Sequence, residues 1–321
     1  MMKIFTDANP SEFPKGSVVT IGAYDGVHLG HRYLIAKTIE LAGSLGAGSV
    51  VVTFDRHPAS VVRPGSAPLL LSDANQKLDC LKETGVENVC IVTFDERRAS
   101  ESATDFVEEF LVGKLNVKMV VVGEDFHFGH NREGNVSLLK DLGRKHGFDV
   151  LGAPLKALGN ENDLALSSTL IRHLIAAGDL EKANTYLGRF YELRGRVEHG
   201  DSRGGNELGY PTANVSFSNL MATPPDGIYA GWVILEGGRR FGAAISLGTR
   251  PTYYPSGGER LLEAFILKFE DDLYGQPIRV QFGKKIRDQE RFSTSEELVA
   301  KIAEDIATVE AFCAGSSLSK G

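Results

Sequence analysis

The chain has 321 residues, of which 42% are hydrophobic and 24% are charged, and these values exclude wholesale disorder. Its 35 basic and 42 acidic residues give a net charge of −7, so neither nucleic acid nor an anionic membrane is an expected partner. The three scattered cysteines are too few for a disulfide framework or a zinc site, which indicates a reducing compartment. The first residues do not resemble a signal peptide, and no apolar run is long enough to span a membrane. We therefore expect a cytoplasmic protein of about two domains.

The first half of the chain alternates apolar runs with amphipathic stretches. Strands are predicted at 17–21, 49–54, 88–94, 118–122 and 149–152. Because these runs are continuously apolar, they are typical of strands buried on both faces of a parallel sheet. Helices are predicted after Gly30 and at about 72–83, 104–115 and 135–146, with Ser72, Thr104 and Asn135 as N-caps. This order predicts an α/β domain with a doubly wound parallel sheet.

The pattern changes at Gly188, after two short predicted helices at 168–177 and 179–187. Six strand-like runs follow, at 190–197, 213–217, 228–235, 241–247, 261–269 and 278–282. Helical spacing returns only after Ser293, which can form a capping box with Glu296. We expect a six-stranded β-barrel with a terminal α-helix, and we place the two domains at 1–187 and 188–321.

Residues 20–32 read TIGAYDGVHLGHR, which combines a strand end, a glycine turn and two histidines. His28 and His31 are expected at the N-terminus of a helix, beyond the carboxyl end of a strand. Ligands bind at this edge of α/β sheets, and helix N-termini favour phosphate. Both histidines could instead be ordinary capping or surface residues. The H-x-G-H spacing and the glycines favour a functional interpretation.

A second polar segment, LSSTLIRHL, spans residues 166–174. Thr169 and Arg172 lie three residues apart on the predicted helix, so both can face one ligand. The planar, permanently charged guanidinium of Arg172 suits a polyphosphate. Taken alone, the segment is more simply a helix cap followed by a surface arginine, and only the histidine motif reverses that preference.

A glycine-rich loop marks the second domain, where residues 195–215 read GRVEHGDSRGGNELGYPTANV. Such a loop can bend closely around a phosphate. Thr212 and Asn214 are two residues apart, so they point the same way in an extended segment, and their oxygens suit a Mg²⁺ that also binds phosphates. An exposed hairpin loop is the alternative interpretation.

Glu263 lies inside the apolar run LLEAFIL. A carboxylate is costly to bury unless it is paired or used. An environment that raises its pKa would make it a general base. Because residues alternate between the two faces of a barrel strand, an outward-facing glutamate is an equally good interpretation.

The two polar motifs of the first domain resemble those of the nucleotidyltransferase superfamily. The longer segments GAYDGVHLGHR, TFDRHP and VVGEDFHFGHNREG resemble the FMN adenylyltransferase module of bacterial bifunctional riboflavin kinase/FAD synthetases. The resemblance implies that His28, His31 and Arg172 are catalytic at the ATP phosphates. Further nucleotide contacts are implied for Gly22, Asp25, Gly30, Ser167, Ser168 and Thr169. The FMN side is implied for His57, Pro58 and Asp125.

The second domain resembles the riboflavin kinase domain in the segments GDSRGGNELGYPTANV, DGIYAGWV, ISLGTRPTY, LLEAFIL, DLYG and IRDQERF, in that order. The resemblance implies that Thr212 and Asn214 hold Mg²⁺ with ATP. It also implies that Glu263 activates the 5′-hydroxyl of riboflavin. Contacts of the loop with the nucleotide are expected from Gly200, Arg203, Gly204 and Gly209.

The expected enzyme is bifunctional. Its barrel would make FMN from riboflavin and ATP, and its first domain would join AMP to FMN, giving FAD and pyrophosphate, with Mg²⁺ in both steps. Ala165 stands where the family usually carries a basic residue, so a riboflavin kinase with weak or lost adenylyltransferase activity is one alternative. A flavin-binding protein without catalysis is another, and the presence of every expected catalytic residue disfavours it. The oligomeric state is left open.

Overall fold

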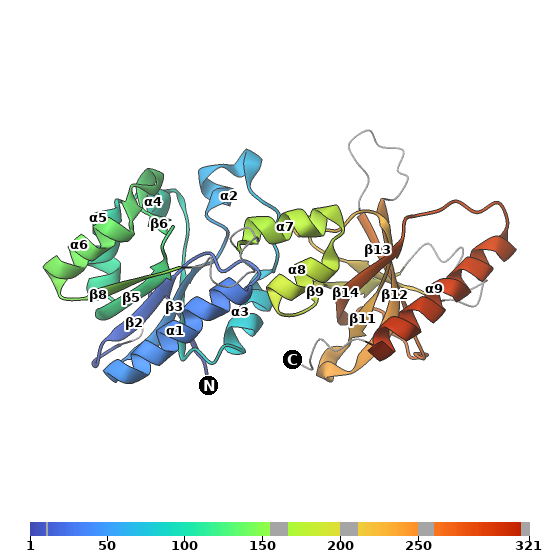
Figure 1. The fold of residues 1–321 in the computed structure, drawn as a ribbon, viewed down its shortest axis with the longest axis horizontal. Helices are drawn as coiled ribbons and strands as arrows, with labels where there is room; N and C mark the ends of the chain where they lie inside the picture. The colour runs from blue at the N-terminus through green and yellow to red at the C-terminus, as the bar shows by residue number, and fades with distance from the viewer. Residues whose placement is uncertain (11, 155–165, 200–210, 250–259, 316–321) are drawn as a thin grey trace. The chain divides into compact units, whose positions relative to one another are not determined.

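A computed structural model describes residues 1–10, 12–154, 166–199, 211–249 and 260–315. Contacts between Cα atoms divide the chain into two compact units, Met1–Ser168 and Thr169–Gly321, which are described separately. The first unit is built on a six-stranded parallel sheet (Figure 1). In spatial order its strands are β1 (Lys3–Thr6), β4 (Asn88–Val92), β3 (Gly48–Phe54), β2 (Ser17–Ile21), β5 (Val117–Gly123) and β8 (Asp149–Ala153). The predicted α/β class is confirmed.

Helices cover both faces of this sheet because successive strand residues point to opposite sides. In β2, Val18 packs with Leu34 of α1 (Leu29–Leu45), whereas Val19 packs in a cluster with Phe110 and Leu139. These two residues come from the π-helix η2 (Phe106–Val112) and from α6 (Val136–His146). Each fully buried apolar side chain of this kind contributes roughly 1.5–3 kcal/mol.

The remaining elements of the first unit are short. They are α2 (Ala59–Val62), η1 (Pro64–Ser66), α3 (Ala74–Lys82), α4 (Glu96–Ala99), α5 (Ala103–Asp105), η3 (His130–Arg132) and the hairpin of β6 (His127–Phe128) with β7 (Gly134–Asn135). Asn135 caps α6 as predicted, with its side chain accepting from the amide of Leu138. The caps predicted at Ser72 and Thr104 are wrong, because Asp73 caps α3 and Ser102 caps α5.

In the second unit, α7 (Ser168–Ala177) and α8 (Leu180–Leu187) precede a closed antiparallel barrel. Around the barrel the strands are β10 (Ala213–Ser216), β13 (Arg260–Ile266), β12 (Arg240–Thr249), β11 (Gly227–Ile234), β14 (Pro277–Arg287) and β9 (Tyr191–Glu198). A short turn, η5 (Glu236–Gly238), joins β11 to β12. The predicted six-stranded barrel is confirmed.

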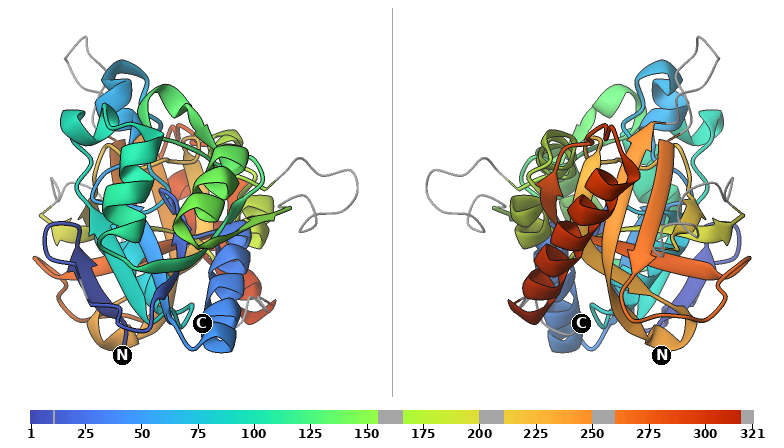
Figure 2. Two further views of the ribbon diagram at one scale, coloured as in Figure 1. Left: turned by 90° about the vertical axis from the view of Figure 1, so that its left-hand side faces the viewer. Right: turned by 90° about the vertical axis from the view of Figure 1, so that its right-hand side faces the viewer.

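The last helix, α9 (Ser295–Gly315), packs on β11 and β12 (Figure 2). Arg287 anchors it, because its Nη2 lies 2.8 Å from Oδ2 of the buried Asp305. The capping box is displaced by one residue from the prediction: Thr294 accepts from the amide of Glu297, whose carboxylate accepts from the amide of Ser293.

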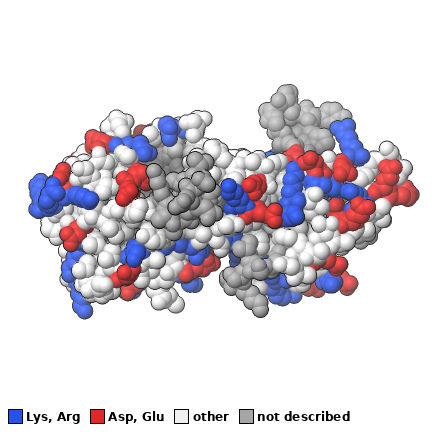
Figure 3. All heavy atoms as spheres, in the orientation of Figure 1, with Lys and Arg blue, Asp and Glu red and all other residues white. Residues whose placement is uncertain are grey.

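The domain boundary at 187/188 stays a prediction. Asn184 of α8 accepts from the amide of Tyr191 at 2.6 Å and donates to the carbonyl of Phe282 at 2.9 Å, so α8 is tied to the barrel. Among the described residues on the face drawn in Figure 3, basic and acidic side chains are interspersed.

Candidate active sites

Three predicted segments follow the carboxyl ends of neighbouring strands. The turn 22–28, which carries His28, follows β2; the segment 55–58, which carries His57, follows β3; and Asp125 comes just after β5. The strand order reverses beside β2, because β3 lies on one side of it and β5 on the other. Such a switch point is where open α/β sheets bind ligands.

His28 and His31 form a stacked pair at the start of α1. His28 is the N-cap of the helix and is 2% exposed. Its Nδ1 accepts from the amide of His31 at 3.3 Å, and the two ring centroids are 3.6 Å apart. Because Nδ1 is an acceptor, the proton of the neutral His28 ring is assigned to Nε2. The pair therefore presents imidazole donors where the helix dipole favours an anion.

The turn before this pair is strained and tightly packed. Tyr24 and Val27 have φ values of 50° and 37°, which are uncommon for residues other than glycine and unfavourable for a β-branched one. The Tyr24 hydroxyl contacts Thr20 Oγ1 at 2.5 Å, and burial raises the pKa of Tyr24 well above its usual range. Strain of this kind persists where the surrounding structure enforces it, as at many active sites.

Gly30 leaves room for the His28 ring. A Cβ at this position would lie 3.1 Å from Cε1 and 3.2 Å from Nδ1 of His28. A Cβ at Gly22 would lie 3.2 Å from the ring of Tyr24. The structure therefore gives both glycines a packing role beside the histidine pair, and their predicted nucleotide contacts stay predictions.

Asp25 connects the turn 22–28 to the residues that precede α3. Its buried carboxylate accepts from the amide of Leu71 at 2.9 Å and from the amide of Ser72 at 3.1 Å. The hydroxyl of Ser72 in turn accepts from the amide of Gly26 at 3.0 Å. The carboxylate of Asp25 is thus engaged with the protein backbone, and its nucleotide contact stays a prediction.

The S-S-T segment reaches the same turn through its second serine. The hydroxyl of Ser168 donates to the carbonyl of Asp25 at 2.9 Å, and the preceding Ser167 is half-buried. Thr169 and Arg172 follow on α7 in the second unit; Thr169 is exposed and Arg172 half-buried. Ala165 lies outside the described residues.

On the predicted FMN side, His57 and Pro58 shape the start of α2. The Nδ1 of His57 accepts from the amide of Ala59 at 3.1 Å, and Pro58 is the N-cap residue. Asp125 is exposed, and its carbonyl contacts Nδ1 of His127 at 2.8 Å. The structure fixes the backbone of these residues, and their contact with flavin stays a prediction.

In the barrel, Asn214 and Glu263 are direct partners across β10 and β13. Side chains of such partners lie on the same face of a sheet. Glu263 is half-buried between the buried Leu262 and Ala264, so it projects to the outer face of the barrel strand, as the second interpretation of the sequence has it. Its role as a general base stays a prediction. Thr212 is exposed just before β10. The predicted contacts at Gly200, Arg203, Gly204 and Gly209 lie outside the described residues.

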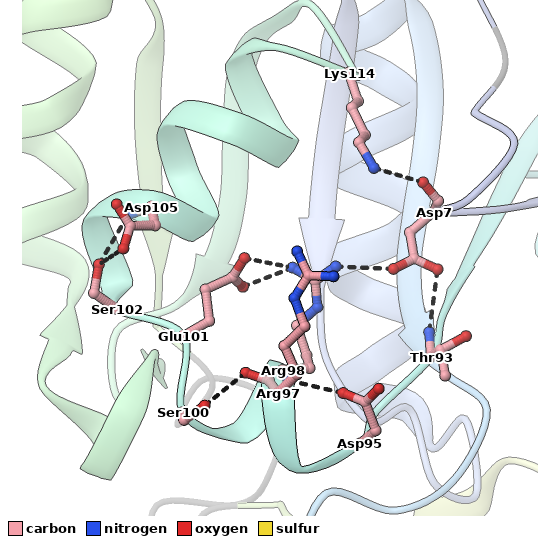
Figure 4. A network of polar contacts seen from close by, with 10 residues as sticks. All are labelled: Asp7, Thr93, Asp95, Arg97, Arg98, Ser100, Glu101, Ser102, Asp105 and Lys114. Carbon is pink, nitrogen blue, oxygen red and sulfur yellow. Dashed lines mark hydrogen bonds and ion pairs between the residues drawn. The ribbon is translucent and has the colours of Figure 1, made fainter.

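A separate cavity of about 540 Å³ lies at the carboxyl ends of β1 and β4. Arg98 lines this cavity, and Figure 4 shows it between Asp7 and Glu101. Its guanidinium is 2.8 Å from Asp7 and 2.6 Å from Glu101, while Lys114 donates to the carbonyl of Asp7 at 2.8 Å. Arg98 and Lys114 are both engaged in these contacts, which connect β1 to α4 and to the end of η2.

Two residues near the histidine turn were absent from the sequence-based site. The Ser72 hydroxyl binds the turn, as described, and the Lys77 ammonium donates to the carbonyl of Phe54 at 2.7 Å, at the end of β3. A lysine on an amphipathic helix is ordinarily a solvent-exposed residue, so the sequence gives no signal for this inward contact.

Two protein families match the chain in succession: FAD synthetase over residues 11–170 and riboflavin kinase over residues 187–313. The two family matches define an enzyme of flavin nucleotide synthesis with two catalytic domains. Proteins named bifunctional riboflavin kinase/FMN adenylyltransferase from Escherichia coli and Pseudomonas fluorescens are each 38% identical, over 95% and 94% of this chain and 95% of each relative. The chain belongs to this bifunctional family, as the sequence predicts.

One solved structure extends the comparison. The crystal structure described as a macrolide-efflux protein from Streptococcus pneumoniae matches with a TM-score of 0.85 and 28% identity, over 96% of this chain and 99% of that chain. The similarity supports the fold of both units. Across the described residues, no helix is both long and apolar enough to cross a membrane.

Proposed function

We propose that the stacked pair His28–His31 carries adenylyl transfer to FMN, and that Glu263 carries phosphoryl transfer to riboflavin. The placement of His28, as the cap of α1 beside the switch point of the sheet, is the observation that supports the proposal most strongly. In this scheme domain 1–187 makes FAD and domain 188–321 makes FMN. The chemistry suits a cytoplasmic enzyme, since ATP serves both steps.

In adenylyl transfer, a phosphate oxygen of FMN attacks the α-phosphorus of ATP. The bond from that phosphorus to the oxygen bridging to the β-phosphate breaks, and pyrophosphate leaves. Negative charge grows on the departing pyrophosphate, where the imidazole N–H groups of His28 and His31 are proposed to donate. Donors that are already oriented toward developing charge lower a barrier without further reorganisation.

The remaining residues of the first site are assigned by charge and position. Ser167, Ser168, Thr169 and Arg172 are proposed to hold the triphosphate, since hydroxyls and a guanidinium are good phosphate donors. His57, Pro58 and Asp125 are proposed to border FMN, because their segments follow the strands on either side of β2. Gly22, Asp25 and Gly30 then keep the turn in shape.

In phosphoryl transfer, Glu263 is proposed to accept the proton of the riboflavin 5′-hydroxyl. The hydroxyl oxygen bonds to the γ-phosphorus of ATP, the bond from that phosphorus to the oxygen bridging to the β-phosphate breaks, and ADP leaves. The pairing of Glu263 with Asn214 supports this role, because it brings the proposed base next to a residue that is proposed to hold Mg²⁺ with ATP. Positioning and charge stabilisation supply most of the catalysis in such reactions.

Mg²⁺ is the proposed cofactor. The hydroxyl of Thr212 and the amide oxygen of Asn214 are hard oxygen donors, which fit an ion that keeps water and phosphate oxygens as its other ligands. When bound, Mg²⁺ neutralises phosphate charge. Riboflavin, FMN, ATP, FAD and pyrophosphate are thus the small-molecule partners.

The purified full chain tests this proposal in two assays with ATP and Mg²⁺, one supplied with FMN and the other with riboflavin. We expect FAD and pyrophosphate to form in equal amounts. Formation of FMN from riboflavin without any FAD would instead support a riboflavin kinase that has lost its adenylyltransferase. Absence of both FMN formation and FAD formation would support a flavin-binding protein without catalysis.

A further inference from the structure

Lys77 is a lysine of α3 whose side chain runs toward the sheet rather than toward solvent. Its Nζ donates to the carbonyl of Phe54 at 2.7 Å and lies 3.3 Å from Thr53 Oγ1. Burial lowers the pKa of Lys77, and the charges of Asp25 and Asp55 oppose that shift. Phe54 is the last residue of β3, so the ammonium binds the point from which the segment 55–58 departs.

The same contact continues into the histidine turn. The hydroxyl of Thr53, which faces Lys77, donates to the carbonyl of Ala23 at 3.1 Å. Ala23 belongs to the turn that leads to His28. A chain of hydrogen bonds therefore runs from Lys77 through Thr53 to this turn, and a second contact of Lys77 fixes the start of the segment that carries His57.

The start of α3 is fixed to the turn independently. Asp25 accepts from the amides of Leu71 and Ser72, immediately before Asp73 caps the helix. The stretch 71–77 is therefore attached to the histidine turn at one end, through Asp25, and to the end of β3 at the other, through Lys77. These contacts bridge the two segments that the proposed function assigns to ATP and to FMN.

We infer that Lys77 is a positioning residue for adenylyl transfer, which holds the segment 55–58 in place relative to the histidine turn. The inference rests on the proposed function of the first domain. Lys77 acts through the backbone of β3 and through Thr53 rather than on the substrates. Displacement of a substrate-binding segment by ~1 Å lowers a rate by about 10²-fold, so this support has a measurable effect.

The test compares Lys77→Met with Lys77→Arg and with Lys82→Met in the full chain. Lys82 is an exposed lysine of the same helix, so Lys82→Met is a matched control. For Lys77→Met we expect kcat/KM for FMN in FAD formation to fall by about 10- to 100-fold. Most of the loss should appear in the KM for FMN. Lys77→Arg, which keeps a cationic donor, should recover most of the activity, and Lys82→Met should match the wild type.

Riboflavin phosphorylation by the same polypeptide shows whether a variant is folded. A Lys77→Met chain with wild-type KM and kcat for FMN would overturn the inference, and so would equal losses of both activities. If Lys77→Met does not fold, Thr53→Val takes its place, and the KM for FMN should rise there too; an unchanged KM would overturn the inference. A wild-type chain that makes FMN but no FAD would overturn the proposed adenylyl transfer itself, and the Lys77 inference with it.

Discussion

The imidazole rings of His28 and His31 stack with centroids 3.6 Å apart and planes inclined by 18°, and the His28 ring also caps the helix on which His31 lies. One residue thus has a structural and a proposed catalytic role, and two substitutions separate them. His28→Asn keeps a good capping side chain, whereas His28→Ala loses it at a cost of about 1 kcal/mol.

Both variants of His28 should lose adenylyl transfer. Removal of a donor that is oriented toward developing charge costs about 10²–10³-fold in kcat, so FAD formation from supplied FMN should fall by that factor in each. Thermal unfolding should distinguish them, because His28→Asn should remain close to the wild type in stability. Wild-type FAD formation by His28→Asn would show that the imidazole serves only as a cap.

Gly30→Ala should impair the same reaction by moving the His28 ring. The added methyl would lie 3.1 Å from Cε1 of His28, so the ring must shift by a few tenths of an ångström. A misplacement of that size predicts a loss of up to about tenfold in kcat for FAD formation. Gly43→Ala is the control on the same helix, since a Cβ there meets nothing within 4 Å. Equal kinetics in the two variants would contradict the packing argument.

Glu263→Gln should separate the two activities in the opposite sense. The amide keeps the volume of the side chain but cannot accept the hydroxyl proton, so FMN formation should fall by about 10²–10⁴-fold. FAD formation from supplied FMN should be unchanged. Loss of both activities in a folded variant would argue against separate sites.

Glu192 makes the stability of the barrel depend on pH. It is 3% exposed and accepts from Arg194 at 2.8 Å and from Arg279 at 2.8 Å. Burial alone would raise the pKa of Glu192, but hydrogen bonds and charge from the two arginines outweigh it and lower that pKa. The stabilisation is therefore complete above the unfolded pKa of about 4.3 and is lost as the pH falls through the folded pKa.

Glu192→Gln measures this contribution. Removal of one partner of a buried ion pair costs about 3–5 kcal/mol, so the free energy of unfolding should fall by that amount at neutral pH. The difference from wild type should shrink in acid. Fluorescence of Trp232, the chain's one tryptophan, follows the barrel in denaturant titrations at several pH values. A difference that is constant with pH would contradict the assigned cause.

Arg98 should slow the reaction of the buried Cys90 with thiol reagents, because it holds β1 against β4. Phe5 pairs with Cys90 in the sheet, and burial raises the pKa of the Cys90 thiol to about 12. Arg98→Met removes the ion pairs that hold the end of β1, so β1 should open more often and Cys90 should react faster with a thiol reagent. Peptide mass spectrometry reads the labelling, and Arg97→Met on the exposed neighbour is the control. Equal rates in both variants would sink this interpretation.

Periodicity predicts the elements that are strongly apolar. The run 17–21 is read correctly as a buried strand because all five residues of β2 lie in the core. In contrast, the sequence does not predict β1. The strand has only four residues, three of them exposed, so it lacks the continuous apolar run that marks the other strands of the sheet. The helix expected at 104–115 contains a π-helix over Phe106–Val112, and a pattern of apolar side chains does not distinguish the two backbones.

The position of a candidate site residue in the fold is predictable where it depends on neighbouring residues in the chain, and is not where it depends on distant contacts. The H-x-G-H motif places both histidines correctly, since a strand, a turn and a helix follow one another there. Ser72 was expected to cap a helix but instead binds Gly26, which lies 46 residues earlier. The inward contact of Lys77 with Phe54 likewise depends on how α3 packs, which no sequence period records.

A time course of products from riboflavin, ATP and Mg²⁺ tests the central claim most directly. If one chain carries both activities at separate sites, FMN should appear first and FAD and pyrophosphate should follow, whereas His28→Asn should stop at FMN. Accumulation of FMN without FAD in the wild type, or FAD formation by His28→Asn at the wild-type rate, would contradict the account.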